Sequence, residues 1–254
     1  MNRRNSVMMS VISPGALRLL GLTAISVVNA GGHMLTVHHL NNSRSQRVLW
    51  LLEELGVPYE IIRYQRQPNM LAPKELRAIH PLGKSPVITD NGNTIAESGA
   101  IISYIVETYG NGRLIPPPNT PERLRYTYWL HYAEGSAMFP LLLKLIFGLM
   151  PKRAPALMRP FTKLIAGTAI TNMINPQLKQ HMAFWEGELA KSEWFAGADF
   201  TAADIQMSFP LEAASSRAGL EDGHPKCVAF LARIHARPAY QRALEKGGPY
   251  QVGK

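Results

Sequence analysis

The chain has 254 residues, of which 46% are hydrophobic and 18% are charged, and its formal net charge is +9. This length exceeds the usual size of one domain, and the composition is that of a folded protein rather than a disordered chain. The basic residues are scattered and form none of the common recognition motifs, which argues against nucleic-acid binding. The single cysteine, Cys227, excludes an intramolecular disulfide framework and CxxC redox chemistry. Its apolar surroundings predict a buried, inert thiol.

Residues 1–33 differ in composition from the rest of the chain. They contain three arginines, no acidic residue, and an apolar stretch over 19–28. A secretory signal has this order of features, although the basic region here is long and the apolar stretch is too short to span a bilayer. We favour a different interpretation, in which residues 1–33 are a non-native or unstructured extension and the chain begins at Met34. Without them the net charge is (27 − 3) − 18 = +6.

The next part of the chain predicts the element order β-α-β-α-β-β-α. Residues 34–40 suit a strand, and the apolar residues of 48–55 recur at i, i+3, i+4 and i+7, as on one face of a helix. Residues 59–64 predict a second strand, parallel to the first. Two β-type runs flank Asn91-Gly92, which favours an antiparallel hairpin, and a helix is expected to open at Glu97. This order is that of an α/β thioredoxin-like fold with a mixed four-stranded sheet.

The second half of the chain predicts helices and no strand. Residues 110–120 contain three consecutive prolines and predict a linker. Thr201 and Asp204 have the spacing of a capping box at the start of a helix. Breaks are expected near Pro151 and Gly197. The predicted helical segments are 121–149, 153–172, 176–191, 201–217 and 225–245.

Four short motifs resemble those of the glutathione transferase superfamily. They are Asn42–Val48, Gly83–Val87, Glu97–Ile101 and Phe200–Ile205. Each is weak alone, but their order and separation are specific, and the resemblance covers nearly everything from residue 34 onward. The run 43–55 resembles the bacterial and fungal Gtt1-like branch.

The resemblance implies a two-domain, cytoplasmic detoxification enzyme. The expected domains are a thioredoxin-like glutathione-binding domain over 34–114 and an all-helical electrophile-binding domain over 120–254. Glutathione would be the co-substrate, with no bound cofactor. A homodimer is implied by the resemblance alone.

Conjugation requires glutathione as the thiolate, because the thiol is a poor nucleophile. Lowering a thiol pKa by two units requires about 2.7 kcal/mol, and one hydrogen bond to a charged acceptor supplies roughly 1.5–3 kcal/mol. One hydroxyl at the start of the first helix is therefore sufficient. Ser43 stands there and matches the catalytic serine of the serine-type transferases. Ser45 and Asn42 are alternative donors, and the alternative role for Ser43 is that of a simple helix N-cap.

The resemblance also implies a set of glutathione-binding residues. Pro86 matches a cis-proline that would present the backbone of Val87 to the cysteinyl unit; the alternative is a trans-proline at the start of an edge strand. Glu97 and Ser98 match the pair that holds the γ-glutamyl end, with a helix cap as the alternative. Lys84 would meet the glycyl carboxylate, or is a solvated lysine. The expected set is Lys84, Ser85, Pro86, Val87, Glu97 and Ser98.

The electrophile site is expected between the domains, on the first helix of the second domain. The candidates are Tyr128, Tyr132 and Met138, although aromatic and methionine side chains on a helix are also typical of plain core. Thr201 and Asp204 are predicted to be structural. The apolar run 138–150 is too short to span a membrane, and is expected to cover the electrophile site or to contact another subunit. Neither a transmembrane segment nor a metal site is expected.

Three functions fit these residues. The first is conjugation of glutathione to small hydrophobic electrophiles, together with reduction of organic hydroperoxides by the same thiolate. The second is a non-catalytic binding or regulatory protein with the transferase fold, because fold does not determine function. The intact set of Ser43, Pro86, Glu97 and Ser98 disfavours it. The third is glutathione-dependent dehalogenation or isomerisation, which would use the same site.

Overall fold

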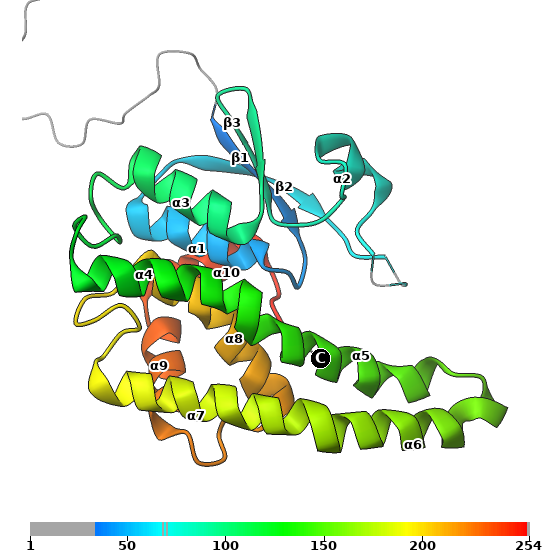
Figure 1. Ribbon diagram of the computed structural model, residues 1–254. Helices are drawn as coiled ribbons and strands as arrows, with labels where there is room; N and C mark the ends of the chain where they lie inside the picture. Colours follow the sequence, from blue (N-terminus) through cyan, green and yellow to red (C-terminus); the bar gives the residue numbers. More distant parts are fainter. Residues whose placement is uncertain (1–33, 68, 70, 253–254) are drawn as a thin grey trace, which may run out of the picture. The chain divides into compact units, whose positions relative to one another are not determined.

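The computed structural model describes residues 34–67, 69 and 71–252 (Figure 1). The interpretation of residues 1–33 therefore lies outside the described residues.

A four-stranded mixed sheet forms the centre of the first domain. Its strands are β1 (Leu35–Leu40), β2 (Tyr59–Tyr64), β3 (Val87–Asp90) and β4 (Asn93–Ala96), in the order β2-β1-β3-β4. β1 runs parallel to β2 and antiparallel to β3, and β3 and β4 form the hairpin that Asn91-Gly92 predicts. The predicted mixed sheet is confirmed.

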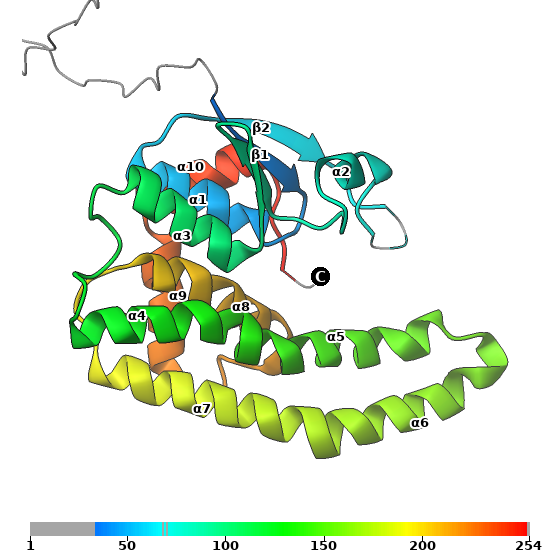
Figure 2. The same ribbon diagram turned by 45° about the horizontal axis from the view of Figure 1, so that its top comes forward.

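Three helices accompany this sheet: α1 (Ser45–Leu55), α2 (Lys74–Ile79) and α3 (Ser98–Tyr109). α1 and α3 lie on the side of the sheet that faces the helical domain (Figures 1 and 2). Gly56 adopts the left-handed conformation, with φ of 68°, and ends α1 as the sequence predicts. The start of α1 therefore lies between the sheet and the helical domain.

The second domain is all-helical. Its helices are α4 (Pro121–Tyr132), α5 (Met138–Arg153), α6 (Arg159–Ala169), α7 (Asn175–Lys191), α8 (Ala202–Ala218), α9 (Pro225–His235) and α10 (Pro238–Gly247). Short π-helical segments, Ala133–Ala137 and Ile170–Ile174, join α4 to α5 and α6 to α7, and a 3₁₀ turn, Ala156–Met158, precedes α6. The two long helical runs so formed lie side by side and antiparallel (Figures 1 and 2).

Two predicted helix boundaries are wrong. Pro151 lies inside the last turn of α5, which continues to Arg153. A proline costs the helix one N–H and crowds the preceding turn, but here only two further residues follow it. The predicted helix over 225–245 is split at Arg237, whose ψ of 130° is extended because Pro238 follows.

The capping box at the start of α8 is confirmed. The Thr201 hydroxyl accepts the Ala203 N–H at 3.3 Å, and the Asp204 carboxylate accepts the Thr201 N–H at 2.8 Å. Asp204 also accepts the Phe195 N–H at 2.8 Å. Burial raises the pKa of Asp204 to about 6 although these donors oppose the shift. Asp204 therefore joins the start of α8 to the loop before it.

Cys227 is fully buried, as predicted. Burial raises the pKa of its thiol, and the nearby Glu186 carboxylate raises it further. A thiol in this state is a poor nucleophile at neutral pH.

Candidate functional site

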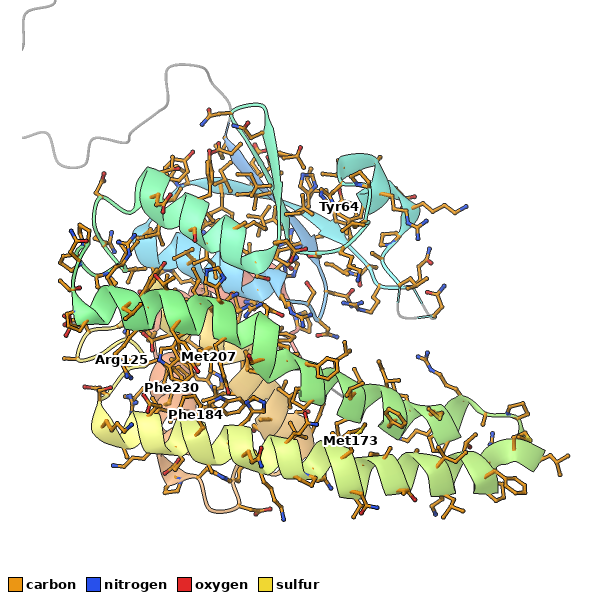
Figure 3. All side chains as sticks on the ribbon, in the orientation of Figure 1. Tyr64, Arg125, Met173, Phe184, Met207 and Phe230 are labelled. Carbon is orange, nitrogen blue, oxygen red and sulfur yellow. The ribbon has the colours of Figure 1, made fainter. Side chains whose placement is uncertain are left out.

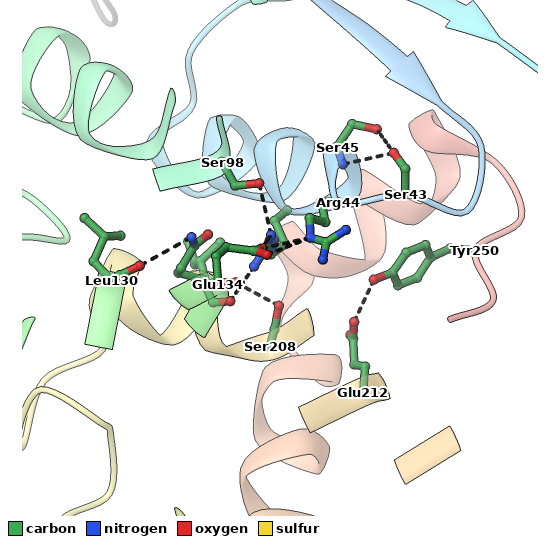
Figure 4. A network of polar contacts seen from close by, with 12 residues as sticks. Ser43, Arg44, Ser45, Ser98, Leu130, Glu134, Ser208, Glu212 and Tyr250 are labelled. Carbon is green, nitrogen blue, oxygen red and sulfur yellow. Dashed lines mark hydrogen bonds and ion pairs between the residues drawn. The ribbon is translucent and has the colours of Figure 1, made fainter. Parts of the chain in front are cut away.

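Three serine hydroxyls lie together where β1 ends and α1 begins. Ser43 Oγ is 2.8 Å from Ser45 Oγ and 3.3 Å from Ser85 Oγ, and it also accepts the Ser45 backbone N–H at 3.2 Å (Figure 4). Ser43 keeps 6% of its surface exposed, whereas Ser45 keeps none. Of these two residues, only Ser43 retains exposed surface.

His39 contacts the Ser45 hydroxyl from the buried side of this cluster, and the same hydroxyl is 3.3 Å from the Leu40 carbonyl. The His39 Nδ1 atom is 2.9 Å from Ser45 Oγ. Burial, and then the charge of Arg63, lower the pKa of His39 to about 4, so the ring is neutral at pH 7. A hydrogen bond to the Gly247 backbone favours the protonated ring, which identifies its acceptor as the carbonyl. With that bond made by the other ring nitrogen, Nδ1 accepts from Ser45, and Ser45 Oγ therefore accepts the Ser43 hydrogen at 2.8 Å.

The first turn of α1 has no side-chain cap. Arg44 occupies the N-cap position and makes no capping hydrogen bond. Ser43 is the alternative N-cap candidate, and the only backbone N–H of α1 that its hydroxyl is shown to accept is that of Ser45. The partial positive charge at a helix N-terminus favours an anion at this place. The side-chain oxygen of Asn42 accepts the N–H of Gln251, so the C-terminal tail reaches this turn.

The residues before β3 border the same cluster. The Ser85–Pro86 peptide bond is cis, as the sequence predicts. Ser85 Oγ also donates to the His38 carbonyl at 3.3 Å. Val87 opens β3 opposite His38 and Ala96. Lys84 is exposed.

Glu97 and Ser98 lie at the start of α3. Glu97 is exposed and has φ of 71° at the N-cap position, without a side-chain capping bond. A left-handed conformation is unfavourable for glutamate, and such residues cluster at functional sites. Ser98 is buried and accepts from Arg47 Nη2 at 3.1 Å. Arg47 thus joins the start of α3 to the helix that follows Ser43.

The sequence interpretation missed a charged group beside these residues. Arg44 Nε lies 2.9 Å from both carboxylate oxygens of Glu134, and the buried Arg47 bonds the same carboxylate (Figure 4). Burial alone would raise the pKa of Glu134, but the two guanidinium groups lower it below its usual value. Arg44 and Arg47 lie within a motif that the sequence singled out, whereas no signal marked Glu134.

The three predicted electrophile contacts do not converge on the Ser43 turn. Tyr128 lines a cavity of about 420 Å³ between α4 and α7, whose other lining residues include Arg125 and Phe184 (Figure 3). The Tyr132 hydroxyl contacts His181 and accepts from Trp185 Nε1 at 3.1 Å, so it too faces α7. Met138 is buried in the core. Phe209 supplies an aromatic ring near the turn, with the Arg44 guanidinium 4.8 Å from its centre.

Within residues 34–67, 69 and 71–252, no group of three or more His, Cys, Asp or Glu side chains is placed to hold a metal ion.

Two family models of known proteins match this chain, one in the domain that contains the sheet and one in the helical domain. Residues 33–107 match the family model "Glutathione S-transferase, N-terminal domain", and residues 149–238 match "Glutathione S-transferase, C-terminal domain". A curated relative, glutathione S-transferase 3 of Schizosaccharomyces pombe, is 34% identical over 84% of this chain and 88% of its own length. The chain belongs to the glutathione S-transferase family.

Further relatives agree with this assignment. Glutathione S-transferase 1 of Saccharomyces cerevisiae is 32% identical over 84% of this transferase and 95% of its own length. The crystal structure of a glutathione S-transferase from Actinobacillus pleuropneumoniae is also 32% identical, with a TM-score of 0.71 over 86% of this chain and 94% of that one. The predicted fold and enzyme class are thereby confirmed.

Proposed function

We propose that this transferase joins the glutathione thiolate to small hydrophobic electrophiles and that the Ser43 hydroxyl stabilises the thiolate. The observation that carries the proposal is the serine cluster at the start of α1, in which Ser45 is engaged by His39 and the Ser43 hydrogen, directed at Ser45 Oγ, can turn to a bound thiolate. The thiolate sulfur forms a bond to an electrophilic carbon, and either the bond from that carbon to a leaving group breaks or, in an addition, a π bond breaks and its electron pair takes up a proton at the other end. A serine-bound thiolate can also attack a peroxide oxygen, which breaks the O–O bond, releases the alcohol and oxidises glutathione to its sulfenic acid. A second glutathione then converts the sulfenic acid to glutathione disulfide and water, so organic hydroperoxides are the second substrate class.

The remaining predicted residues would hold the rest of glutathione. Glu97 offers an exposed carboxylate to the γ-glutamyl ammonium, and Ser98 with the start of α3 suits its carboxylate. Lys84 suits the glycyl carboxylate, and the backbone of Val87 suits the cysteinyl unit. A relative from Pseudomonas fluorescens, 25% identical with a TM-score of 0.65, has been solved with two glutathione molecules bound, which supports glutathione as the ligand.

We further propose the domain limits 34–114 and 120–254 and a homodimer in the cytoplasm. Residues 110–120 are the proposed linker between these domains, which is supported by their place between the end of α3 and the start of α4. Light scattering of the purified chain measures the oligomeric state directly.

The test is the pKa of the bound thiol. We expect glutathione on the wild-type protein to show thiolate ultraviolet absorbance well below the usual thiol pKa of about 8.5. Ser43→Ala should raise the bound thiol pKa by about one to two units, because one charge-assisted hydrogen bond is lost. The second-order rate constant with a chlorodinitrobenzene should fall about 10- to 100-fold, while glutathione affinity changes little.

Ser45→Ala is the matched control, because this hydroxyl is fully buried. We expect it to shift the thiol pKa by clearly less than Ser43→Ala. An equal shift in the two variants, or an unchanged pKa in Ser43→Ala, would contradict the assignment of Ser43. Turnover of an organic hydroperoxide by the same preparations then shows whether both substrate classes are used.

A further inference from the structure

The guanidinium group of Arg217, in the last turn of α8, has no anionic partner among the described residues. It makes no hydrogen bond or ion pair with any of them, although its Nε atom is buried. A basic residue in the last turn of a helix interacts favourably with the helix dipole, but this role does not require a buried nitrogen. Buried donors are normally paired, so we infer that Arg217 meets an acceptor that the chain itself does not supply.

Arg217 lies close to Arg44, the residue that follows Ser43. Burial is the main cause that lowers the pKa of Arg217, and the positive charge of Arg44 lowers it further, so the two guanidinium groups repel each other. The carboxylates of this region are engaged by other groups: Glu134 is paired with Arg44, and Glu212 accepts two tyrosine hydroxyls. Positive charge is therefore in excess beside the turn that carries Ser43.

The C-terminal tail connects the end of α8 to the same turn. The Tyr250 hydroxyl donates to Glu212 at 2.7 Å, shortly before Arg217 on α8 (Figure 4). The next residue, Gln251, donates its backbone N–H to the side chain of Asn42 at 2.8 Å. The last part of α8 and the start of α1 therefore border one region of the protein.

Arg44 has a fixed orientation and still keeps free donors. Its Nε atom donates to Glu134 at 2.9 Å, and its guanidinium carbon lies 4.8 Å from the centre of the Phe209 ring. Its two terminal amino groups make no hydrogen bond within the part of the chain that the structure describes, and 32% of the side chain is exposed. A guanidinium plane held in this way suits a carboxylate, whose two oxygens match two parallel N–H groups.

The place of Arg217 in the fold indicates which substrate brings the anion. The residues proposed above to hold glutathione all belong to the domain that contains the sheet. Arg217 belongs to the helical domain, which is expected to hold the electrophile, and Arg44 lies between Arg217 and the proposed thiolate donor, Ser43. An anion on the electrophile fits this arrangement better than a carboxylate of glutathione.

We propose that the electrophile of this transferase carries a carboxylate group, bound by Arg44 and Arg217, near its activated carbon. This inference rests on the proposed function and narrows its substrate class to organic acids with an apolar body. In the displacement reaction, the glutathione sulfur forms a bond to the activated carbon and the leaving group departs with its electron pair. The carboxylate is unchanged, so the two arginines act in binding and orientation alone.

The test compares electrophiles that differ only in this charge. One pair is a chlorodinitrobenzoate and its amide, and the other is iodoacetate and iodoacetamide, in which the carboxylate is closer to the reacting carbon. Each kcat/KM of the full chain is divided by the rate constant of the free glutathione thiolate, which removes the intrinsic reactivity of the compound. We expect the acid to be favoured over its amide by about ten-fold or more in at least one pair.

Arg217→Met should lower the ratio of acid to amide about ten-fold, because one charge-assisted contact is lost. Its urea midpoint should not fall below that of wild type, since Arg217 has no internal hydrogen bond to lose. Arg242→Met is the matched control. It removes an arginine that is paired with Glu53, near the other end of α1, and should leave the ratio of acid to amide as in wild type.

The outcomes separate this inference from the proposed function. Wild type that favours neither acid, or Arg217→Met with the wild-type ratio, would overturn the inference, while turnover of the amides would still support the proposed function. Weaker glutathione binding by Arg217→Met at an unchanged ratio would also overturn it, because Arg217 would then hold a carboxylate of glutathione. Absence of conjugation with every compound would overturn the proposed function and the inference together.

Discussion

At the scale of single residues, the chemistry depends on which of several similar side chains is free to act. The sequence places Asn42, Ser43 and Ser45 on one turn and leaves the choice among them open. Burial and His39 separate the two serines, since Ser45 is enclosed and engaged while Ser43 retains exposed surface. Both differences arise from tertiary structure. The His39 ring, for example, is hydrogen-bonded to the backbone of Gly247, which is more than 200 residues away in the chain. Local sequence could therefore not distinguish the buried state of Ser45 from the partly exposed state of Ser43.

The neutral state of His39 makes a prediction about acid stability. Its pKa is about 4 in the folded protein and about 6.5 in an unfolded chain. The unfolded state therefore binds more protons in this window, and stability present above pH 6.5 is lost as the pH falls toward 4. From pH 7 to pH 5 this loss amounts to about 2 kcal/mol. His39→Gln should show a smaller decrease in the free energy of unfolding by about that amount, measured by urea denaturation at both pH values.

His131→Gln is the matched control, because His131 is exposed on α4. It should lose as much stability as wild type between the two pH values. Asp204, whose pKa is raised to about 6, contributes with the opposite sign, but it is present in all three proteins and cancels in the comparison. Equal pH sensitivity of His39→Gln and wild type would mean that His39 is not buried in its neutral form.

At the scale of elements, periodicity and the residues that begin or end helices predict most strands and helices correctly. Two helix boundaries are predicted wrongly. The strand over 59–64, the Asn91-Gly92 turn and the capping box at Thr201 are local features, and each is confirmed. Pro151 predicts a helix break, but a proline near the end of a helix removes only one hydrogen bond, and α5 continues through it to Arg153. The π-helical segment that carries Glu134 has no recognisable sequence signal.

The capping box predicts unequal costs at its two positions. Thr201→Ala removes one capping acceptor and should destabilise the protein by about 1 kcal/mol. Asp204→Ala leaves the buried N–H groups of Phe195 and Thr201 without an acceptor, and should cost about 2–4 kcal/mol. Thr168→Ala on the exposed side of α6 is the control and should change stability by less than about 0.5 kcal/mol. Urea denaturation measures all three, and similar costs for Thr201→Ala and Asp204→Ala would refute the proposed role of Asp204.

At the scale of the whole molecule, the sequence predicts both domains but not how they are joined. Arg47 is 2% exposed and reaches three elements, through Ser98 on α3, Glu134 after α4, and the Gln206 carbonyl on α8. A buried arginine cannot be told from a surface arginine by its neighbours in the chain, because its partners are 51 to 159 residues away. For this reason, no local sequence pattern predicts that Arg47 connects the two domains.

This connection predicts a coupling energy between the two domains. Arg47→Met leaves Glu134 paired with Arg44 but removes the donor of the buried Ser98 hydroxyl and of the Gln206 carbonyl, and should cost about 2–4 kcal/mol. Arg47→Met with Glu134→Leu removes both charges, so the double variant should be less destabilised than the sum of the single variants by at least about 1 kcal/mol. Arg242→Ala, which breaks a more exposed pair with Glu53, should cost less than about 1 kcal/mol. Additive effects in a urea-denaturation cycle would show that Arg47 and Glu134 act independently, and the predicted coupling between the two domains through this pair would be wrong.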